Sequence, residues 1–402
     1  MVDVITVFSV AGVIIVIGFL ANMFFKKTSF PDTLFLIAIG IILGPVLKVF
    51  LPEEMMSVTP IFTPLTLMII LFEGGLNMEI YKVLSQSFRA TILGVLYVLM
   101  AMVFVLIFGY FVLGFGWLEA LMLGPMTAGT SSVVMVPLMR KLNVEDEVGV
   151  TLSLESTITD VFNIVLVITF LQMYLGGLVD LQQTASVIAS KFAVGIVLGF
   201  IVGFIWIKIL GVTKKQEYNY MLTIAALILC FAGTEFLGGS GSLAALLFGL
   251  ALGNYETLHR ITGGKTDLSY MTEITETVKK FQGEIAFLIR AFFFVFLGLV
   301  YMPYWLGFLY AGIIVVINLM FRHVAVRVST LKSDMYKHKK FMTLMCGTGL
   351  ANATLSVLVY NALTGLPNPV PYAFLYPLIV TNIIIINNII TALAPIIQKL
   401  KY

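Results

Sequence analysis

The stretch PMTAGTSSVV, residues 125–134, lies in the middle of an apolar run that extends over 117–141. A second stretch of this kind, CGTGLANATL at 346–355, lies within the run 340–363. Glycine, proline and small polar residues weaken a helix, so each run is predicted to be a membrane helix interrupted at mid-span. Small residues can also serve close helix packing alone. Two such stretches at matching positions favour interruption, which is typical of a transport site near the bilayer midplane.

The composition places the whole chain in a membrane. Of its 402 residues, 60% are hydrophobic and only 11% are charged, which leaves too little polar surface for a soluble protein. Many segments exceed the roughly 20 apolar residues that cross a bilayer as a helix. The alternating segments of about 10 residues that build a membrane β-barrel are absent from the pattern. The predicted fold class is therefore an all-α polytopic membrane protein.

The hydropathy pattern predicts about 13 transmembrane helices. Their expected ranges are 4–25, 29–51, 60–78, 88–114, 117–141, 146–175, 183–210, 219–237, 240–255, 280–301, 305–330, 340–363 and 371–395. Lysine and arginine gather in every second turn, beginning with the turn after the first span, and in the C-terminal tail. Because positive charge stays cytoplasmic, we expect a multi-pass protein of the cell membrane with its N-terminus outside and its C-terminus in the cytoplasm.

The domain organisation follows from the two interrupted spans. We expect residues 1–402 to form a single integral membrane transport unit, in which the polar stretch near 255–280 is only a cytoplasmic loop. The interrupted spans are seven spans apart, which is an odd offset. Residues 1–175 are therefore predicted to form a first repeat, 183–210 a linker helix, and 219–402 a second, inverted repeat.

Ionisable side chains inside the predicted spans are costly and mark functional positions. Asp160 lies roughly 20 Å into span six, near the midplane. Ser156 shares its helix face, whereas Glu155 points about 140° away from Asp160. We therefore expect Asp160 to serve the ion and Glu155 to pair with a cation of the protein; a protonated structural acid is the alternative for Asp160. The ionisable candidates are Glu73, Glu155, Asp160, Arg322 and Arg290.

Five motifs that follow one another along nearly the whole chain resemble the cation:proton antiporter superfamily. They are SFPDTLFLIAIGIILGP (29–45), LFEGGLNME (71–79), ESTITD (155–160), GGSGSLAALLFGLALGN (238–254) and FFFVFLGL (292–299). The chain is most similar to the branch of 13-span sodium/proton antiporters, which carry Glu-Ser, two residues and then Asn-Asp in span six. The resemblance implies inverted repeats, a core domain with broken, crossing spans five and twelve, and a second domain that forms a homodimer interface.

The resemblance also implies an ion site. Asp160 matches the essential carboxylate that binds cation or proton, Ser156 matches a neighbouring ligand, and Thr130 matches the threonine of the span-five crossing. Na⁺ is therefore expected at these three residues, and no other metal site is expected. Glu73 matches an acid of the third span that lies near this site.

Two basic residues have counterparts in the same family. Arg322 matches the arginine of span eleven that pairs with the glutamate of span six, here Glu155. A guanidinium group stays charged in a membrane and matches a carboxylate bidentately, so a structural ion pair is expected. The alternative for Arg322 is a side chain that reaches out to water at the cytoplasmic end of its helix. Arg290 corresponds either to a basic residue that electrogenic members carry in span ten or to a helix-end anchor.

The chain departs from the family pattern at three places. Thr159 stands where the family has asparagine before the essential aspartate. Thr130, Ser131 and Ser132 replace the Thr-Asp-Pro of the sodium branch and are closer to the potassium-efflux branch. Residues 349–352 lack the arginine of the usual Gly-Leu-Arg-Gly. Thr159 and Ser131 remain candidate ion ligands, and the choice between Na⁺, Li⁺ and K⁺ stays open.

Together these features predict a secondary active antiporter that exchanges a monovalent cation for H⁺ by alternating access, electroneutrally. A hard, oxygen-lined site suits Na⁺, Li⁺ or K⁺, and Asp160 cannot hold a proton and a cation at once. The alternatives are a K⁺/H⁺ efflux antiporter and a sodium-coupled organic-anion symporter of related fold. A channel would need a filter or a polar stripe along its pore, which the pattern does not contain.

Catalysis is not expected from this chain. An intramembrane protease needs paired acids, a Ser–His pair or a His–Glu metal site, and the ionisable residues of the spans form none of these. We therefore expect no enzyme activity, no catalytic residues, no cofactor and no nucleic-acid partner. The expected partners are monovalent cations, protons, the lipid bilayer and a second copy of the chain.

Overall fold

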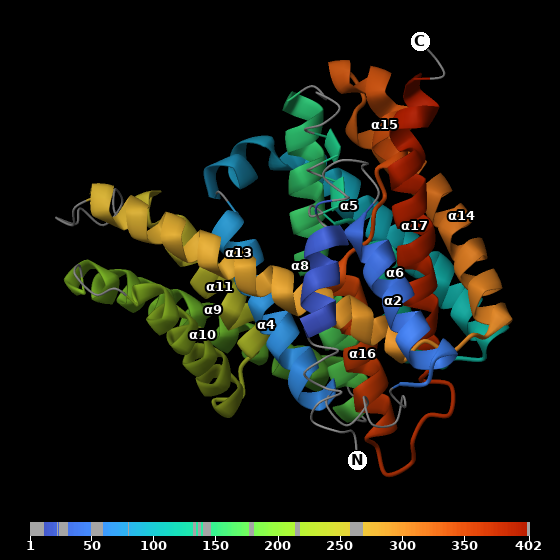
Figure 1. Ribbon diagram of the computed structural model, residues 1–402, viewed down its shortest axis with the longest axis horizontal. Coiled ribbons are helices and arrows are strands. Elements are labelled where there is room, and N and C mark those ends of the chain that lie inside the picture. Colours follow the sequence, from blue (N-terminus) through green and yellow to red (C-terminus); the bar gives the residue numbers. More distant parts are fainter. Residues whose placement is uncertain are drawn as a thin grey trace. The chain divides into compact units, whose positions relative to one another are not determined.

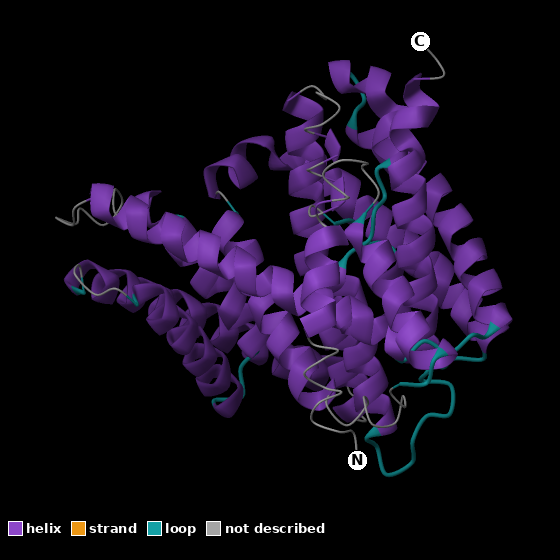
Figure 2. Ribbon diagram, viewed as in Figure 1, coloured by secondary structure: helices purple, strands orange, loops and turns teal. Residues whose placement is uncertain are grey.

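The computed structural model describes residues 12–21, 23, 31–49, 59–78, 80–131, 134–135, 138–139, 146–176, 181–213, 218–257 and 268–399. Every regular element in these ranges is a helix (Figure 2). In chain order the helices are Gly12–Ala21, α2 (Asp32–Ile41) continued by η1 (Ile42–Val46), α4 (Thr59–Asn77), α5 (Ile80–Phe108) continued by η2 (Gly109–Leu113), α6 (Trp117–Thr127), α8 (Asp146–Gly176), α9 (Leu181–Val212), α10 (Asn219–Phe236), α11 (Gly241–Gly253), α13 (Leu268–Leu299), α14 (Trp305–Ser329), η3 (Asp334–His338), α15 (Lys339–Leu344), α16 (Leu350–Thr364) and α17 (Leu375–Lys399).

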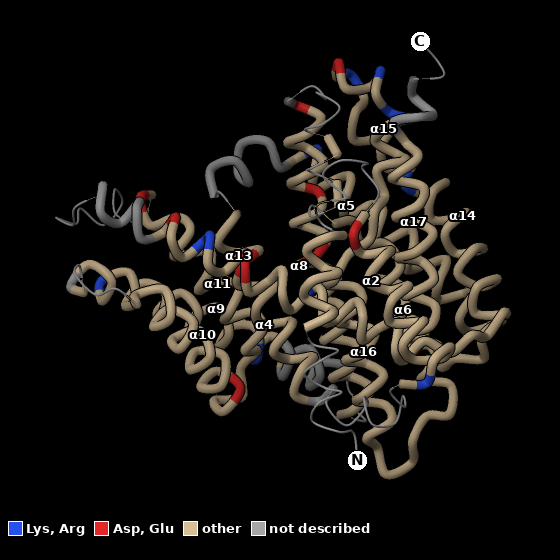
Figure 3. The backbone as a smooth tube through the Cα atoms, in the orientation of Figure 1, with Lys and Arg blue, Asp and Glu red and all other residues tan. Residues whose placement is uncertain are grey.

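These helices confirm the predicted all-α membrane fold. Seven of the described helices are long and apolar enough to cross a membrane, and five more are apolar but only 10–17 residues long. Together with α6, they fall on each of the spans predicted from hydropathy. Charged residues appear in Figure 3 as short, isolated stretches on a mostly uncharged tube. This distribution is expected when most helix faces contact lipid or an apolar core.

Two boundary predictions are wrong. Span four was predicted to start at residue 88, but α5 begins eight residues earlier, at Ile80. Residues 268–280 were expected to belong to a cytoplasmic loop, but α13 begins at Leu268 and continues without a break to Leu299. The first turns of α13 carry acidic and basic residues between apolar ones at helical spacing. The mean hydropathy of this amphipathic stretch is low because its charged and apolar residues are averaged together. The average ignores that they lie on different faces of the helix.

Both predicted helix interruptions are present. Span five is helical as α6 up to Thr127, and residues 128–131 are not helical. Span twelve is helical as α15 up to Leu344, is unwound over 345–349, and resumes as α16 at Leu350. Apart from Met345, small residues fill both unwound segments, as the helix-weakening composition predicts.

The chain folds into two compact units, each built from several stretches. Unit 1 comprises 1–63, 86–175 and 290–402, and unit 2 comprises 64–85 and 176–289. Unit 1 takes residues from both predicted repeats, so these units are different from the repeats. The repeat boundaries remain a prediction.

Unit 2 is held together by small residues that let helix backbones approach closely. Helices α9, α10 and α11 pack side by side in it (Figure 1). A Cβ atom on Gly199 of α9 would stand 2.6 Å from the Ala244 carbonyl oxygen of α11. A Cβ atom on Gly249 would overlap the Phe72 carbonyl oxygen of α4. The small residues of the motif 238–254 are therefore explained by packing, as in other membrane helix pairs.

Unit 1 contains both unwound segments and the helices around them. Helix α14 packs beside α17, and α16 packs against both α17 and α6 (Figure 1). At another crossing, Gly40 of α2 faces Gly298 near the end of α13, and a Cβ atom on Gly298 would overlap the Ile37 carbonyl oxygen. Two of the sequence motifs, 29–45 and 292–299, thus meet at a contact that only glycine allows.

Candidate ion-binding site

The two unwound segments contact each other directly in unit 1. The Ser131 backbone N–H donates to the Gly347 carbonyl oxygen at 2.7 Å, and the Thr348 hydroxyl donates to the Gly129 carbonyl oxygen at 3.2 Å. A Cβ atom on Gly349 would overlap Ser131 Oγ, so the two segments meet without room for a side chain there. This crossing gives the broken helices partners for backbone groups that unwinding leaves unpaired.

Asparagine side chains satisfy the carbonyl groups at the end of α6. The Asn352 Nδ2 of α16 donates to the Met126 carbonyl oxygen at 2.8 Å. The Asn318 Nδ2 of α14 donates to both the Thr127 carbonyl oxygen and the Thr127 hydroxyl, each at 3.1 Å. The last carbonyl groups of a helix have no partner within the helix, so these amides cap the end of α6 inside the membrane.

Arg322 of α14 donates hydrogen bonds to carbonyl oxygens at the C-terminal end of α15. Its Nη2 donates to the Met345 carbonyl oxygen at 2.7 Å, and its Nε donates to the Met342 carbonyl oxygen at 3.3 Å. The Thr391 hydroxyl of α17 donates to the Leu344 carbonyl oxygen at 3.2 Å. The C-terminal end of α15 is thus bound from two neighbouring helices.

Helix α17 also orients the second unwound segment at Thr348. The Thr348 backbone N–H donates to Asn388 Oδ1 at 3.0 Å, and Asn387 Nδ2 donates to the Thr348 hydroxyl at 2.9 Å. Asn388 Nδ2 donates in turn to the Thr33 hydroxyl of α2 at 2.8 Å. Buried polar groups that are bonded in this way hold one conformation of the backbone.

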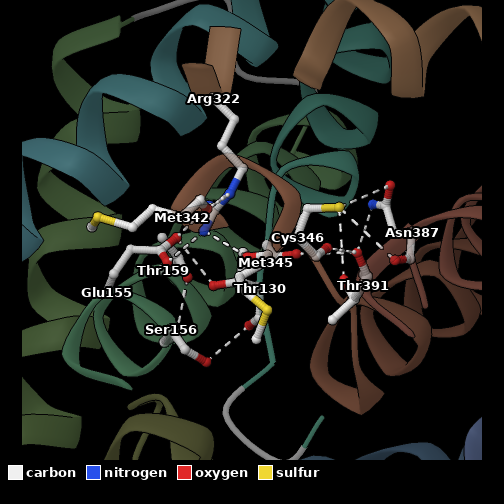
Figure 4. A network of polar contacts seen from close by, with 12 residues as sticks. Thr130, Glu155, Ser156, Thr159, Arg322, Met342, Met345, Cys346, Asn387 and Thr391 are labelled. Carbon is white, nitrogen blue, oxygen red and sulfur yellow. Dashed lines mark hydrogen bonds and ion pairs between the residues drawn. The ribbon is translucent and has the colours of Figure 1, made fainter. Parts of the chain in front are cut away.

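Glu155 and Arg322 form a bidentate ion pair at this crossing (Figure 4). The Arg322 Nη1 lies 3.0 Å from Glu155 Oε1, and the Nη2 lies 3.1 Å from Oε2. The Thr130 hydroxyl donates to Glu155 Oε1 at 3.0 Å, and the Tyr97 ring centroid lies 5.4 Å from the Arg322 guanidinium carbon. Both side chains of the pair are 0% exposed, so the alternative in which Arg322 reaches out to water is wrong.

Asp160 has different surroundings on the same helix. It is partly exposed and forms no hydrogen bond or ion pair with any residue that the structure describes. Ser156, one turn earlier on its face, is buried and donates to the Thr130 carbonyl oxygen at 3.0 Å (Figure 4). The structure therefore brings Ser156, Thr130 and Glu155 together at the crossing, and the Asp160 carboxylate one turn further along α8 has no partner among the described residues.

Two further candidate ligands, Thr159 and Ser131, form hydrogen bonds within the protein. The Thr159 hydroxyl donates to the Ser156 carbonyl oxygen of its own helix at 3.0 Å, and its methyl group faces Gly94 of α5. Ser131 is buried and contributes its backbone N–H to the crossing. Ser132 lies outside the described residues. Whether Thr159 and Ser131 contact an ion remains a prediction.

The remaining candidates lie away from the crossing in the sequence. Glu73 belongs to α4 in unit 2, where its carbonyl oxygen accepts from Asn77 Nδ2 at 2.9 Å. Arg290 lies in α13 at the point where that helix enters unit 1, and it is half-buried. Their predicted roles, near the ion site and as a basic partner, remain predictions.

Sequence reasoning missed the asparagines that surround the crossing. Asn163, Asn318, Asn387 and Asn388 are buried in spans, and Asn352 was noted only as part of the altered motif of span twelve. Asparagine is rare in apolar helices because its amide needs two kinds of partner. Asparagine in the apolar stretches VFNIV, VINLM and INNII therefore indicates a buried polar contact. The sequence pattern does not identify the group that each amide contacts.

Comparison with known families identifies what kind of membrane protein has this crossing. The family model described as sodium/hydrogen exchanger, transmembrane, matches residues 12–396. The chain belongs to the sodium/hydrogen exchanger family. Membership in this exchanger family confirms the resemblance to cation:proton antiporters, and the family transports ions rather than catalysing a reaction.

Individual members of the sodium/hydrogen exchanger family are similar to the chain over different lengths. The Na⁺/H⁺ antiporter 1 of Methanocaldococcus jannaschii is 24% identical, with 97% of this chain and 92% of that protein aligned. The K⁺/H⁺ antiporter NhaP2 of Shewanella sp. (strain MR-4) is 25% identical, over 63% of this chain and 45% of that protein. The solved structure of the sodium proton antiporter MjNhaP1 from M. jannaschii at pH 8 superposes with a TM-score of 0.77 at 24% identity, covering 97% of this chain and 95% of that one. This similarity establishes the fold.

Proposed function

We propose that the protein is a secondary active antiporter that exchanges a monovalent cation for H⁺ across the cell membrane by alternating access. The observation that carries the proposal is the Asp160 carboxyl group, which lies in a membrane helix without a partner among the described residues. An ionised acid in a membrane needs a counter-charge or water. A proton and a cation can each supply that counter-charge, and they compete for the same oxygens.

The crossing next to Asp160 offers groups that replace the hydration shell of a small cation. Helices α6 and α15 both end there, and the C-terminal end of a helix carries partial negative charge. The Thr130 hydroxyl donates its hydrogen to Glu155 and retains lone pairs on its oxygen. Asp160, Ser156 and Thr130 are therefore the oxygen ligands that we propose for Na⁺.

Exchange follows from the competition at Asp160. The carboxylate crosses the membrane core only when a proton or a cation neutralises it. The empty, charged form cannot return, so transport of a cation in one direction is coupled to transport of a proton in the other. The other acid of the helix, Glu155, is bonded through both oxygens to Arg322, so the protein itself supplies its counter-charge. One titrating acid implies one proton per cation and an electroneutral cycle.

The cation is proposed to be Na⁺, with K⁺ as a second candidate. The relative that aligns over most of this chain is named a Na⁺/H⁺ antiporter, and another relative is named a K⁺/H⁺ antiporter. Ser131, which stands where the sodium branch has an acid, favours K⁺ because it removes one negative charge beside the site. A stronger field of charged oxygens suits the smaller ion.

We also propose a homodimer with the N-terminus outside and the C-terminus in the cytoplasm. The lysine and arginine pattern of the turns supports this orientation, and the resemblance to dimeric antiporters supports the assembly. Cysteine labelling of Asp3→Cys, which precedes the first predicted span, and Lys401→Cys in intact and opened cells tests the orientation. Crosslinking in native membranes at low expression tests the dimer, and a product of monomer size alone would contradict it.

The exchange itself is tested in proteoliposomes that contain a pH-sensitive dye. We expect an imposed H⁺ gradient to dissipate on addition of Na⁺, Li⁺ or K⁺, and to persist with choline. The variant Asp160→Asn should not respond to any cation. Uptake of Na⁺ together with an organic acid, without a counterflow of protons, would establish the symporter alternative instead.

A further inference from the structure

Asn163, Asn318 and Asn352 surround the end of α6, and each has at least one amide atom without a hydrogen-bond partner among the described residues. Asn163 of α8 is 0% exposed, and neither its Nδ2 nor its Oδ1 has a hydrogen-bond partner among the described residues. Asn318 and Asn352 use Nδ2 to cap α6, but each leaves Oδ1 without a partner there. Buried polar groups are nearly always bonded, so this cluster requires an explanation.

Two of these amides converge on the unwound segment of span five. A Cβ atom on Gly129 would stand 2.5 Å from Asn352 Nδ2, 2.6 Å from Asn352 Oδ1 and 2.8 Å from Asn163 Nδ2. Only glycine therefore leaves space for both amides at this position. Side chains from α8 and α16 face one point of the broken helix, although the two residues are far apart in the sequence.

Asn163 also shares a helix face with the proposed ion ligands. It follows Asp160 by three residues and Ser156 by seven, and both spacings are close to whole turns of a helix. Ser156 bonds to the Thr130 carbonyl oxygen, and Asn163 faces Gly129, the residue before Thr130. Asn163 thus lies about 10 Å further along α8 than Ser156 on the face that carries the site.

We propose that Asn163 and Asn352 are specificity-determining residues that bind the transported monovalent cation through their amide oxygens. This inference rests on the proposed exchange function. An amide carbonyl is a hard, neutral oxygen ligand, and a half-turn of the terminal amide presents either oxygen or nitrogen to the same point. The number and field strength of such oxygens distinguish Li⁺, Na⁺ and K⁺. A neutral amide does not bind a proton, so the pair acts on the cation and not on the proton.

The decisive variant is Asn163→Leu, which keeps the branching of the side chain and removes both polar atoms. We expect the ratio of the apparent KM values for Na⁺ and K⁺ in proteoliposomes to change by about tenfold or more. The pH dependence at saturating cation should stay as in the wild type. The melting temperature in detergent should be equal or higher, because an amide without a partner is exchanged for an apolar group.

The matched control is Asn382→Leu in α17. Asn382 is also 0% exposed and also retains an Nδ2 without a partner among the described residues, but its Oδ1 accepts from the Tyr301 hydroxyl at 2.9 Å. This variant should leave the ratio of KM values unchanged. Asn163→Ala serves as a second variant, because it removes the amide and does not introduce a branched apolar group into the site.

The outcomes separate this inference from the proposed function. If wild-type liposomes exchange protons for cations, but both Asn163 variants keep the wild-type ratio of KM values, the inference is wrong and the function stands. If wild-type liposomes respond to no alkali cation, the proposed function fails. In that case cation-dependent thermal stabilisation, compared between wild type and Asn163→Leu for Na⁺ and K⁺, still tests whether the amides bind cations. Equal stabilisation of both proteins would overturn the inference.

Discussion

Glu155 and Asp160 are two acids on one helix, five residues apart, in opposite situations. Glu155 is wholly buried, and its two oxygens accept bonds from Arg322 and Thr130. Asp160 is partly exposed and has no partner among the described residues. The chemistry of the two side chains is nearly the same. The difference therefore teaches that neighbouring helices decide which acid is paired within the fold and which keeps no partner among the described residues.

The surroundings of Glu155 explain why a buried charge is tolerated there. Removing two charges from water is costly, and it is offset only by good geometry and further hydrogen bonds. Arg322 satisfies these conditions, because it binds Glu155 bidentately and also donates to the Met342 and Met345 carbonyl oxygens. The ion pair therefore connects α8 and α14 to the unwound part of span twelve.

The largest expected effect is on transport in Asp160→Asn. This change removes the titrating group and keeps the size of the side chain, so exchange should fall to the level of empty liposomes while melting stays near that of the wild type. The matched control is Glu147→Gln, near the start of α8. Glu147 forms an exposed pair with Arg89 at 3.2 Å, which is worth at most about 1 kcal/mol. Cation-driven proton release at a near wild-type rate in Asp160→Asn would contradict the mechanism.

The next effect is on stability at the ion pair. Glu155→Ala or Arg322→Ala leaves an unpaired buried charge, and each should destabilise the protein by about 3–5 kcal/mol. The double variant should recover part of this loss, because neither charge then lacks its partner. The measurement is thermal melting of the wild type, both single variants and the double variant in one detergent. Simple addition of the two losses would mean that the pair contributes no coupling, and Glu155 would then be assigned to the cation site.

A smaller effect is expected at Thr130, whose hydroxyl donates to Glu155 Oε1. Thr130→Val removes the bond to Glu155 and should lower stability by about 1.5–3 kcal/mol, the range for a hydrogen bond to a charged group. Thr130→Ser retains a hydroxyl and should restore both stability and the apparent affinity for Na⁺. Melting and proteoliposome exchange of the two variants provide the measurement. Equal melting temperatures and equal apparent affinities for Na⁺ in Thr130→Val and Thr130→Ser would show that the hydroxyl contributes neither to stability nor to cation binding.

The smallest expected effect is that of the membrane potential. Because Asp160 is the one acid proposed to carry the ions, with one proton per cation, imposing a potential with valinomycin and K⁺ should not shift the equilibrium point of Na⁺/H⁺ exchange. The experiment compares the cation gradient at which the dye signal stays constant, with and without the potential. A clear shift would mean that a second charged group takes part. Arg290→Ala and Glu73→Gln would then show which residue is responsible.

Much of the fold was predictable from the sequence. Where the structure describes the span boundaries, hydropathy located them to within a few residues, apart from the early starts of α5 and α13. The small, polar stretches located both unwound segments, because helix propensity is a local property that does not depend on distant contacts. The acids and Arg322 stood out for a similar reason, since an ionisable residue is costly anywhere in a membrane.

The sequence by itself determined an all-α membrane protein with interrupted helices in spans five and twelve and a short set of ionisable candidates. Only the tertiary structure decided which groups meet. Thr348 bonds to Gly129, 219 residues away, and Asn163 faces the same glycine from a third helix. Periodicity places a side chain on a face of its own helix, but it does not say which helix covers that face. The satisfaction of each buried polar group depends on that packing. So does the difference between Glu155, which is paired with Arg322, and Asp160, which has no partner among the described residues.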